Sequence, residues 1–162
     1  MPVATQDESI PAADLAAIVA QYALYVEMAD RISARRQTAN NFFLSISSAL
    51  VGVGGLSVSR GELSMPLTYI WASAVSGVFV SLLWWRLITS YRDLNSAKFK
   101  VVHEMETLLP VKPYHAEWSE VGGGKVSKLY LPVTHAERIV PIGFGILHLV
   151  LAVIVSIARA AA

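Results

Sequence analysis

The segment SLLWWRLITSYRDLNSAKFKVVHEME, residues Ser81–Glu106, begins apolar and becomes charged without any interruption by glycine or proline. Trp84 and Trp85 mark the change, and Arg86 follows them directly. Tryptophan is enriched where a membrane meets water, and an arginine beside it reaches the lipid headgroups. The segment therefore predicts one helix that leaves a membrane at the two tryptophans and continues into water.

Three stretches of the chain contain no Asp, Glu, Lys or Arg, and they cover residues 37–59, 63–85 and 139–158. Each is about 20 residues long, the length that a helix needs to cross a hydrocarbon core of about 30 Å. The alternative is a globular bundle of three buried helices. A chain of 162 residues, however, has too little interior to cover three helices that are apolar on every side. We therefore expect an all-α membrane protein with three transmembrane helices.

The positive charges predict how these helices are oriented. Only Arg60 and Arg159, of the 13 lysines and arginines, lie beyond the outer ends of the expected spans. Because Lys and Arg accumulate on the cytoplasmic side, we expect the N-terminus in the cytoplasm and the C-terminus outside. The first residues are acidic, so we expect no cleavable signal peptide. The net charge of +1 argues against a nucleic-acid partner, and the absence of cysteine fits either side of a membrane.

Two amphipathic segments lie outside the spans. Between Leu15 and Ile32, apolar residues recur every three or four positions, which is typical of an amphipathic helix. We expect this N-terminal helix to end near Arg35–Arg36 and to pack on protein rather than on lipid, since its polar face also carries acids. Its expected partner is a second apolar stripe, on a cytoplasmic extension of the second span. That stripe consists of Leu94, Ala97, Val101, Met105 and Leu108.

The chain accordingly divides into four parts. Residues 1–36 hold the cytoplasmic amphipathic helix, and residues 37–90 hold the first two transmembrane helices with a short outer turn. Residues 91–134 hold a cytoplasmic helix and a loop, and residues 135–162 hold the third transmembrane helix. In the loop, Gly122–Gly124 suit either a turn between two short strands or irregular chain. Thr134 and Glu137 have the spacing of a capping box, which predicts the start of the third helix.

Polar residues gather where all three spans meet the inner membrane surface. They are candidates for an oligomer contact or for anchoring in the headgroups, as are Val101 and Met105 of the extension. The boundary candidates are Asp30, Arg31, Arg35, Arg36, Asn40, Asn41, Arg86, Tyr91, Arg92, Asn95, Glu137 and Arg138. We hypothesise a partly buried network with Arg35 and Arg86 as its cations and Asp30 and Glu137 as its anions. The alternative is a set of solvated anchors, and Asn40 and Asn41 fit either solvation or an interhelical hydrogen bond.

Small and polar residues within the spans predict close helix contacts. Ser73, Gly77 and Ser81 recur every four positions, and such rows let the backbones of membrane helices approach. His148 lies near the middle of the third span, where an ionisable group is costly. It fits a neutral imidazole hydrogen-bonded to a neighbouring helix better than it fits a pore-facing or proton-sensing group.

Signatures of catalysis are scarce. Gly124-Lys125 lacks the earlier glycine and the following Ser or Thr of a phosphate-binding loop. The four histidines show no metal-ligand spacing, and Glu104 and Glu106 fit a solvated helix face better than an acid–base pair. We therefore expect no enzyme activity, no cofactor and no metal; whether a small-molecule ligand binds stays open.

Three segments carry a resemblance to a known family. They are YVEMADRISARRQTANNFFLSISSAL at Tyr25–Leu50, WRLITSYRDLNSAKFKVVHEMETLLP at Trp85–Pro110 and LPVTHAERIVP at Leu131–Pro141. Together they resemble the RipA-like family of small bacterial inner-membrane proteins, described as octameric, over most of residues 22–150. The resemblance implies a multi-span homo-oligomer, an octamer, with no established enzymatic activity. With the orientation expected from the charges, the C-terminus of such a protein lies in the periplasm, and its expected partners are membrane lipid and further copies of the chain. The resemblance supplies no catalytic residues.

Two classes of function remain. The first is a non-enzymatic oligomeric assembly of the inner membrane, a pore or a scaffold whose cytoplasmic helices form a ring. The second is a membrane-disrupting defence or stress effector, against which the third span counts. An enzyme acting on lipid is a distant third.

Overall fold

The computed structural model describes residues 11–59, 66–124 and 133–161. Within these ranges it contains helices and turns but no strand. The elements, in chain order, are α1 (Ala12–Ser59), α2 (Leu67–Glu106), α3 (Pro113–Glu120), the 3-10 turn η1 (Gly122–Gly124) and α4 (Val133–Ala160). The expected all-α membrane architecture is confirmed, since α1, α2 and α4 are each long and apolar enough to cross a membrane.

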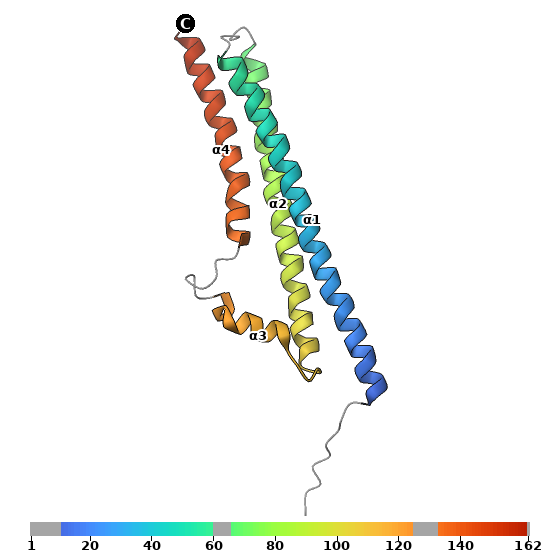
Figure 1. The fold of residues 1–162 in the computed structure, drawn as a ribbon. Helices are drawn as coiled ribbons and strands as arrows, with labels where there is room; N and C mark the ends of the chain where they lie inside the picture. Colours follow the sequence, from blue (N-terminus) through green and yellow to red (C-terminus); the bar gives the residue numbers. More distant parts are fainter. Residues whose placement is uncertain (1–10, 60–65, 125–132, 162) are drawn as a thin grey trace, which may run out of the picture.

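Helices α1 and α2 form a long antiparallel hairpin, and α4 lies beside it along the end where the C-terminus is found (Figure 1). Helix α2 has 40 residues and α1 has 48, so their lengths are about 60 and 72 Å. Both lengths are about twice the thickness of a hydrocarbon core. Each helix therefore spans a membrane with half of its length to spare, as expected for α2.

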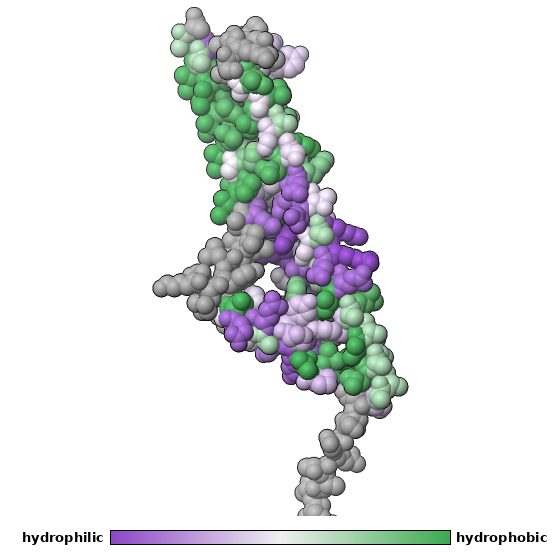
Figure 2. Space-filling model, in the orientation of Figure 1, coloured by the Kyte–Doolittle hydropathy of each residue, from purple (hydrophilic) through white to green (hydrophobic). Residues whose placement is uncertain are grey.

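The surface divides in the same way. Figure 2 shows hydrophobic residues over the end that contains α4, a hydrophilic band across the middle and a mixed surface beyond it. We call residues 37–59, 67–85 and 139–160 the apolar half. We call residues 12–36, 86–106 and 113–124 the charged half. The band between them is the level at which Trp84 and Trp85 were expected to leave the membrane.

The predicted break after the N-terminal amphipathic helix is wrong. Helix α1 runs from Ala12 to Ser59 without interruption, through Arg35 and Arg36 and into the first span. No glycine or proline lies between Ala12 and Val51, so nothing in the sequence ends the helix. The change from charged to apolar composition marks a change of surroundings rather than of secondary structure.

The segment after α2 contains a helix that the sequence analysis missed. Thr107 closes α2, Pro110 follows, and Pro113 begins α3, which crosses the end of α2 steeply (Figure 1). Gly122 and Gly123 then adopt φ angles of 66° and 61°, which only glycine takes up readily. Because α3 precedes Gly122–Gly124, the interpretation as a turn between two short strands is wrong. The three glycines instead form a tight turn with positive φ angles, which fits the other interpretation, a loop. The capping-box side chain of Thr134 lies outside the described residues, but α4 does begin at Val133.

Candidate functional site

An ion pair joins α1 to the start of α4 at the level of the polar band. Arg36 Nε lies 3.5 Å from Glu137 Oε2, and both side chains are only 18% exposed. Neither of these two atoms has a hydrogen bond to another described group. The pair therefore holds two partly desolvated charges against one another, and each would be costly alone.

Trp84 is buried inside the bundle and contacts α1 at Asn40, one helical turn after Arg36. Its indole Nε1 donates a hydrogen bond of 2.8 Å to Oδ1 of Asn40, and its side chain is almost completely buried. The ring stacks on Phe43, with centroids 6.0 Å apart, and also meets Phe144 of α4. Trp84 was expected at the membrane surface, but it instead connects the helices inside the bundle. Asn40 was expected to be either solvated or hydrogen-bonded to another helix, and the structure shows the interhelical bond.

Trp85 and Arg138 form a second contact at this level. The guanidinium carbon of Arg138 lies 5.9 Å from the centroid of the Trp85 ring, close enough for a cation–π interaction. It links the start of α4 to α2. Arg36, Trp84, Trp85 and Glu137 together tie all three spans to one another where they meet the charged half.

The other predicted boundary residues are less closely joined. Arg35 and Arg86 are exposed and pair with no described acid, so the structure places the cation of the pair at Arg36 instead. Asp30 and Asn41 are exposed as well, and Arg31 pairs with Glu27 one helical turn away. The half-buried candidates on α2 are Tyr91, Arg92, Asn95, Val101 and Met105.

A second polar centre, which the sequence analysis missed, lies at the far end of α2. Glu106 is fully buried, so its assignment to a solvated face is wrong. Its carboxylate accepts hydrogen bonds from Tyr22 Oη of α1 at 3.0 Å and from the backbone N–H groups of Tyr114 and His115 at 2.8 and 3.0 Å. Nδ1 of His103 lies 3.4 Å away. One carboxylate therefore fastens α1 to α2 and caps the first turn of α3.

The surroundings of Glu106 also determine its charge. Burial alone raises its pKa, but the hydrogen bonds from Tyr114, Tyr22, His115 and His103 outweigh that effect and hold the pKa below its usual range. Burial and the bond to the Glu106 carboxylate raise the pKa of Tyr22 to about 12. At neutral pH the centre therefore consists of an ionised acceptor and a protonated phenol donor.

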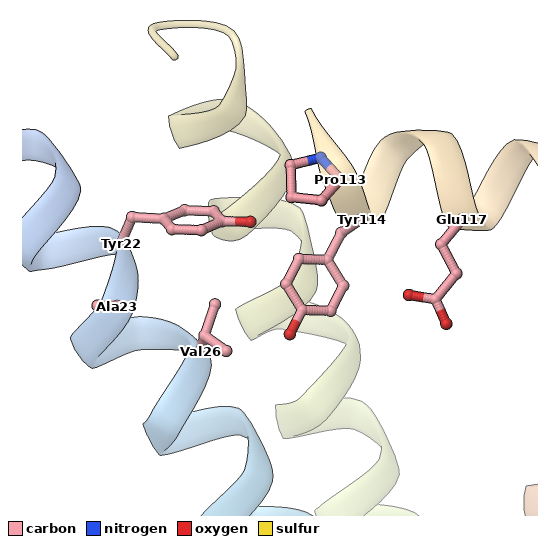
Figure 3. Close-up of a pocket in the computed structure, with 6 residues that line it drawn as sticks. All are labelled: Tyr22, Ala23, Val26, Pro113, Tyr114 and Glu117. Carbon is pink, nitrogen blue, oxygen red and sulfur yellow. The ribbon is translucent and has the colours of Figure 1, made fainter. Parts of the chain in front are cut away.

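Two hollows flank this centre. One, of about 400 Å³, lies between α1 and α3 and is lined by Tyr22, Ala23, Val26, Pro113, Tyr114 and Glu117, and Figure 3 shows both tyrosine rings reaching into the space between the helices. The other, of about 580 Å³, lies between α2 and α3 and is lined by Asn95, Ser96, Phe99, Lys100, His103, Tyr114, Glu117, Trp118 and Val121. The described residues hold no cluster of three metal-ligating side chains.

His148 lies inside the chain, at the contact between α4 and α2. Its side chain is 5% exposed, and its ring packs directly on Gly77. It thus meets a neighbouring helix, but Nε2 is buried without a described hydrogen-bond partner. The predicted small-residue row is the reason for this packing, because any side chain at position 77 would occupy the space of the ring.

The Arg36–Glu137 pair gives a first prediction. Replacing Arg36 with Gln leaves Glu137 half-buried without a counter-ion, so we expect a loss of about 1–3 kcal/mol in unfolding free energy. The matched Arg35→Gln variant, one residue away and exposed, should change stability by less than about 0.5 kcal/mol. Thermal melting of the purified protein in one detergent compares the two. Equal melting temperatures for both variants would show that the pair is only a surface contact.

Comparison with known proteins identifies one family. The model of the octameric membrane protein family (8xMP) matches residues 19–157, which is most of the chain. This match confirms the octameric membrane family that the sequence resemblance implied. No curated protein and no solved structure matches the chain significantly.

Proposed function

Since the chain belongs to the octameric membrane protein family, we propose that it works as a non-enzymatic homo-octamer of the bacterial inner membrane. In this proposal the apolar halves of eight copies form a membrane ring that acts as a scaffold or a pore. The charged halves form a second ring in the cytoplasm, with the C-termini in the periplasm. Membrane lipid and further copies of the chain are the partners, and nucleic acid is not.

The orientation rests on the charges. Along the sequence, all but two of the lysines and arginines fall before the first span or between the second and third spans. The positive-inside bias assigns the side of the membrane that these segments share to the cytoplasm. The exposed residues of the polar band, which include Arg35 and Arg86, then lie at the level of the inner headgroups.

The observation that supports a cytoplasmic ring is the exposed apolar surface of the charged half. Five large apolar side chains there are between 39% and 55% exposed, although the charged half has no lipid to cover them in this orientation. They are Val19, Leu24, Met28, Leu94 and Trp118. Contact with neighbouring copies covers such residues, and a head-to-tail contact that closes after eight copies gives a ring.

Leu24 and Met28 are the residues we assign to this contact on α1. They are 55% and 39% exposed and lie one helical turn apart, so they form one apolar patch. Tyr22 and Ala29 of the same helix point inward, toward Glu106 and into the core respectively. The patch is therefore available to a neighbour without disturbing the fold of the chain.

Imaging of the protein in lipid nanodiscs tests the assembly. We expect eightfold particles, and the central radius separates a pore from a closed scaffold. The Leu24→Asp variant should give smaller particles by light scattering, because it places a carboxylate in each of eight apolar contacts at a cost of several kcal/mol. The control Gln21→Asp adds the same charge to an exposed polar position on α1 and should keep the octamer.

Circular dichroism shows whether the Leu24→Asp chain still folds. A helical chain with a smaller particle supports the assigned contact. An intact octamer of Leu24→Asp would refute the role of this patch, and particles of another symmetry would refute the proposed assembly.

A further inference from the structure

Three buried polar atoms in the apolar half have no hydrogen-bond partner among the described residues. They are Oγ of Ser47 on α1, Oγ of Ser81 on α2 and Nε2 of His148 on α4. The three residues are 0%, 3% and 5% exposed. Unpaired polar groups are especially costly inside a membrane, where no bulk water can satisfy them.

These atoms come from three helices at nearly the same level. The His148 ring packs on Gly77, and a Cβ built on Gly145 would lie 3.5 Å from Cβ of Ser81. Gly77 and Ser81 are one turn apart on α2, as Gly145 and His148 nearly are on α4. The contact between α2 and α4 therefore brings Ser81 and His148 close together.

The register of α1 against α2 adds Ser47 to this level. The two helices are antiparallel, and the hydrogen bond between Asn40 and Trp84 fixes their alignment. Seven residues, or two turns, after Asn40 comes Ser47, and seven residues before Trp84 comes Gly77. Ser47 therefore lies opposite the segment of α2 on which His148 packs, and its complete burial shows that it faces the bundle interior.

Other serines of the membrane helices satisfy themselves locally. The hydroxyls of Ser45, Ser76 and Ser156 donate to the carbonyl four residues earlier at 2.7–2.8 Å. Such bonds are the usual solution for serine within a helix. Ser47 and Ser81 are more deeply buried but do not make this bond, so their hydroxyls are free for another partner.

We propose that Ser47, Ser81 and His148 bind a water molecule inside each copy of the chain, in the middle of the membrane. A buried water typically makes about three hydrogen bonds to groups that have no other partner. Two hydroxyls and one imidazole nitrogen supply that number, with both donors and acceptors available. The water joins α1 to the contact between α2 and α4.

The chemistry of the three groups favours water over an ion. Residues 37–59, 67–85 and 139–158 contain no Asp, Glu, Lys or Arg, so no formal charge lies beside the site on these helices. Divalent metals prefer carboxylates or several imidazoles, whereas this set offers one imidazole and two neutral hydroxyls. The proposed water also lies within one copy of the chain, so it is separate from any central channel of a ring.

Proton-detected solid-state NMR of the ¹⁵N-histidine-labelled protein in lipid bilayers tests this site. Comparison with His148→Gln identifies the His148 signals among those of the four histidines. We expect magnetisation transfer from bound water to the His148 imidazole in the wild-type protein. Ser47→Ala and Ser81→Ala should each lose at least half of that transfer, whereas the control Ser76→Ala, whose hydroxyl bonds to its own helix, should retain it.

The outcomes decide the proposal. Transfer to His148 that falls in both buried-serine variants and persists in Ser76→Ala supports the shared water. No transfer in the wild-type protein would overturn it, as would transfer that both variants leave unchanged. Because the wild-type measurement alone can refute the proposal, the test stays decisive even if a serine variant fails to fold.

Discussion

Replacing Gly77 with alanine is expected to lower the stability of the protein by about 3 kcal/mol, near the upper end of typical overpacking costs. The added Cβ would overlap Cγ, Cδ2 and Nδ1 of His148, and these atoms belong to a rigid ring that is itself buried. Helix α4 must then move away from α2, which breaks the contact between the His148 ring and Gly77. We expect the melting temperature to fall by about 6–12 °C.

Two other glycines serve as controls for this variant. A Cβ on Gly52 or Gly143 would meet no atom within 4 Å, so Gly52→Ala and Gly143→Ala should leave the melting temperature unchanged or raise it slightly. The cause of the loss is tested by removing the ring. In a His148→Ala background, Gly77→Ala should cost less than about 1 kcal/mol. If Gly77→Ala cost the same stability with and without the His148 ring, the clash with this ring would not be the cause of the loss.

Replacing Glu106 with alanine is the second large change, with an expected loss of about 3–5 kcal/mol. The variant leaves the Tyr22 hydroxyl and two backbone N–H groups of α3 without their acceptor in a buried place. It also detaches α3 from α2. Glu104→Ala is the matched control, because Glu104 lies two residues away and is exposed, and it should melt like the wild-type protein.

The charge of Glu106 adds a dependence on pH. Its pKa is lower in the folded protein than the ordinary value of 4.5, so the unfolded chain binds the proton more readily. The stabilisation is therefore complete above about pH 4.5 and is lost as the pH falls through the folded-state pKa. The Glu106→Gln variant should lack this part of the acid loss. The test is the melting temperature of the wild-type protein and of Glu106→Gln at several pH values between pH 3 and pH 7. If both melting temperatures changed with pH by the same amount, the role assigned to Glu106 would be contradicted.

The sequence alone determined the broad architecture of this protein. Lipid selects for apolar composition over about 20 consecutive residues, and that property is local enough to be counted along the chain. The three spans, within residues 37–158, and the continuous passage of α2 from apolar to charged surroundings were therefore predicted from composition. The membrane family was predicted separately, from a resemblance over most of residues 22–150. The small-residue row at Ser73, Gly77 and Ser81 likewise indicated where helices approach closely.

The tertiary structure decided which polar residues are paired. In the charged half, the predicted stripe through Leu94, Val101 and Met105 is displaced by one residue from the side of α2 that is most deeply buried. That side carries Val102 and Glu106 at 0% exposure, whereas Leu94 is 49% exposed. An apolar pattern does not mark Glu106 as buried, because its burial depends on donors from Tyr22 and Tyr114, which lie 84 and 8 residues away in the sequence.

The same reason accounts for the ion pair at the polar band. Arg35 and Arg36 are adjacent and chemically identical, and only the rotation of α1 against α4 turns Arg36 toward Glu137. Side chains one residue apart on a helix point about 100° apart, so only one of the two arginines can face Glu137. The sequence indicates that a charged pair is possible but does not say which arginine forms it. Hydrophobic periodicity acts along one helix and can be read from its residues, whereas a buried charge is stabilised by specific atoms of other helices, which only the folded chain brings within reach.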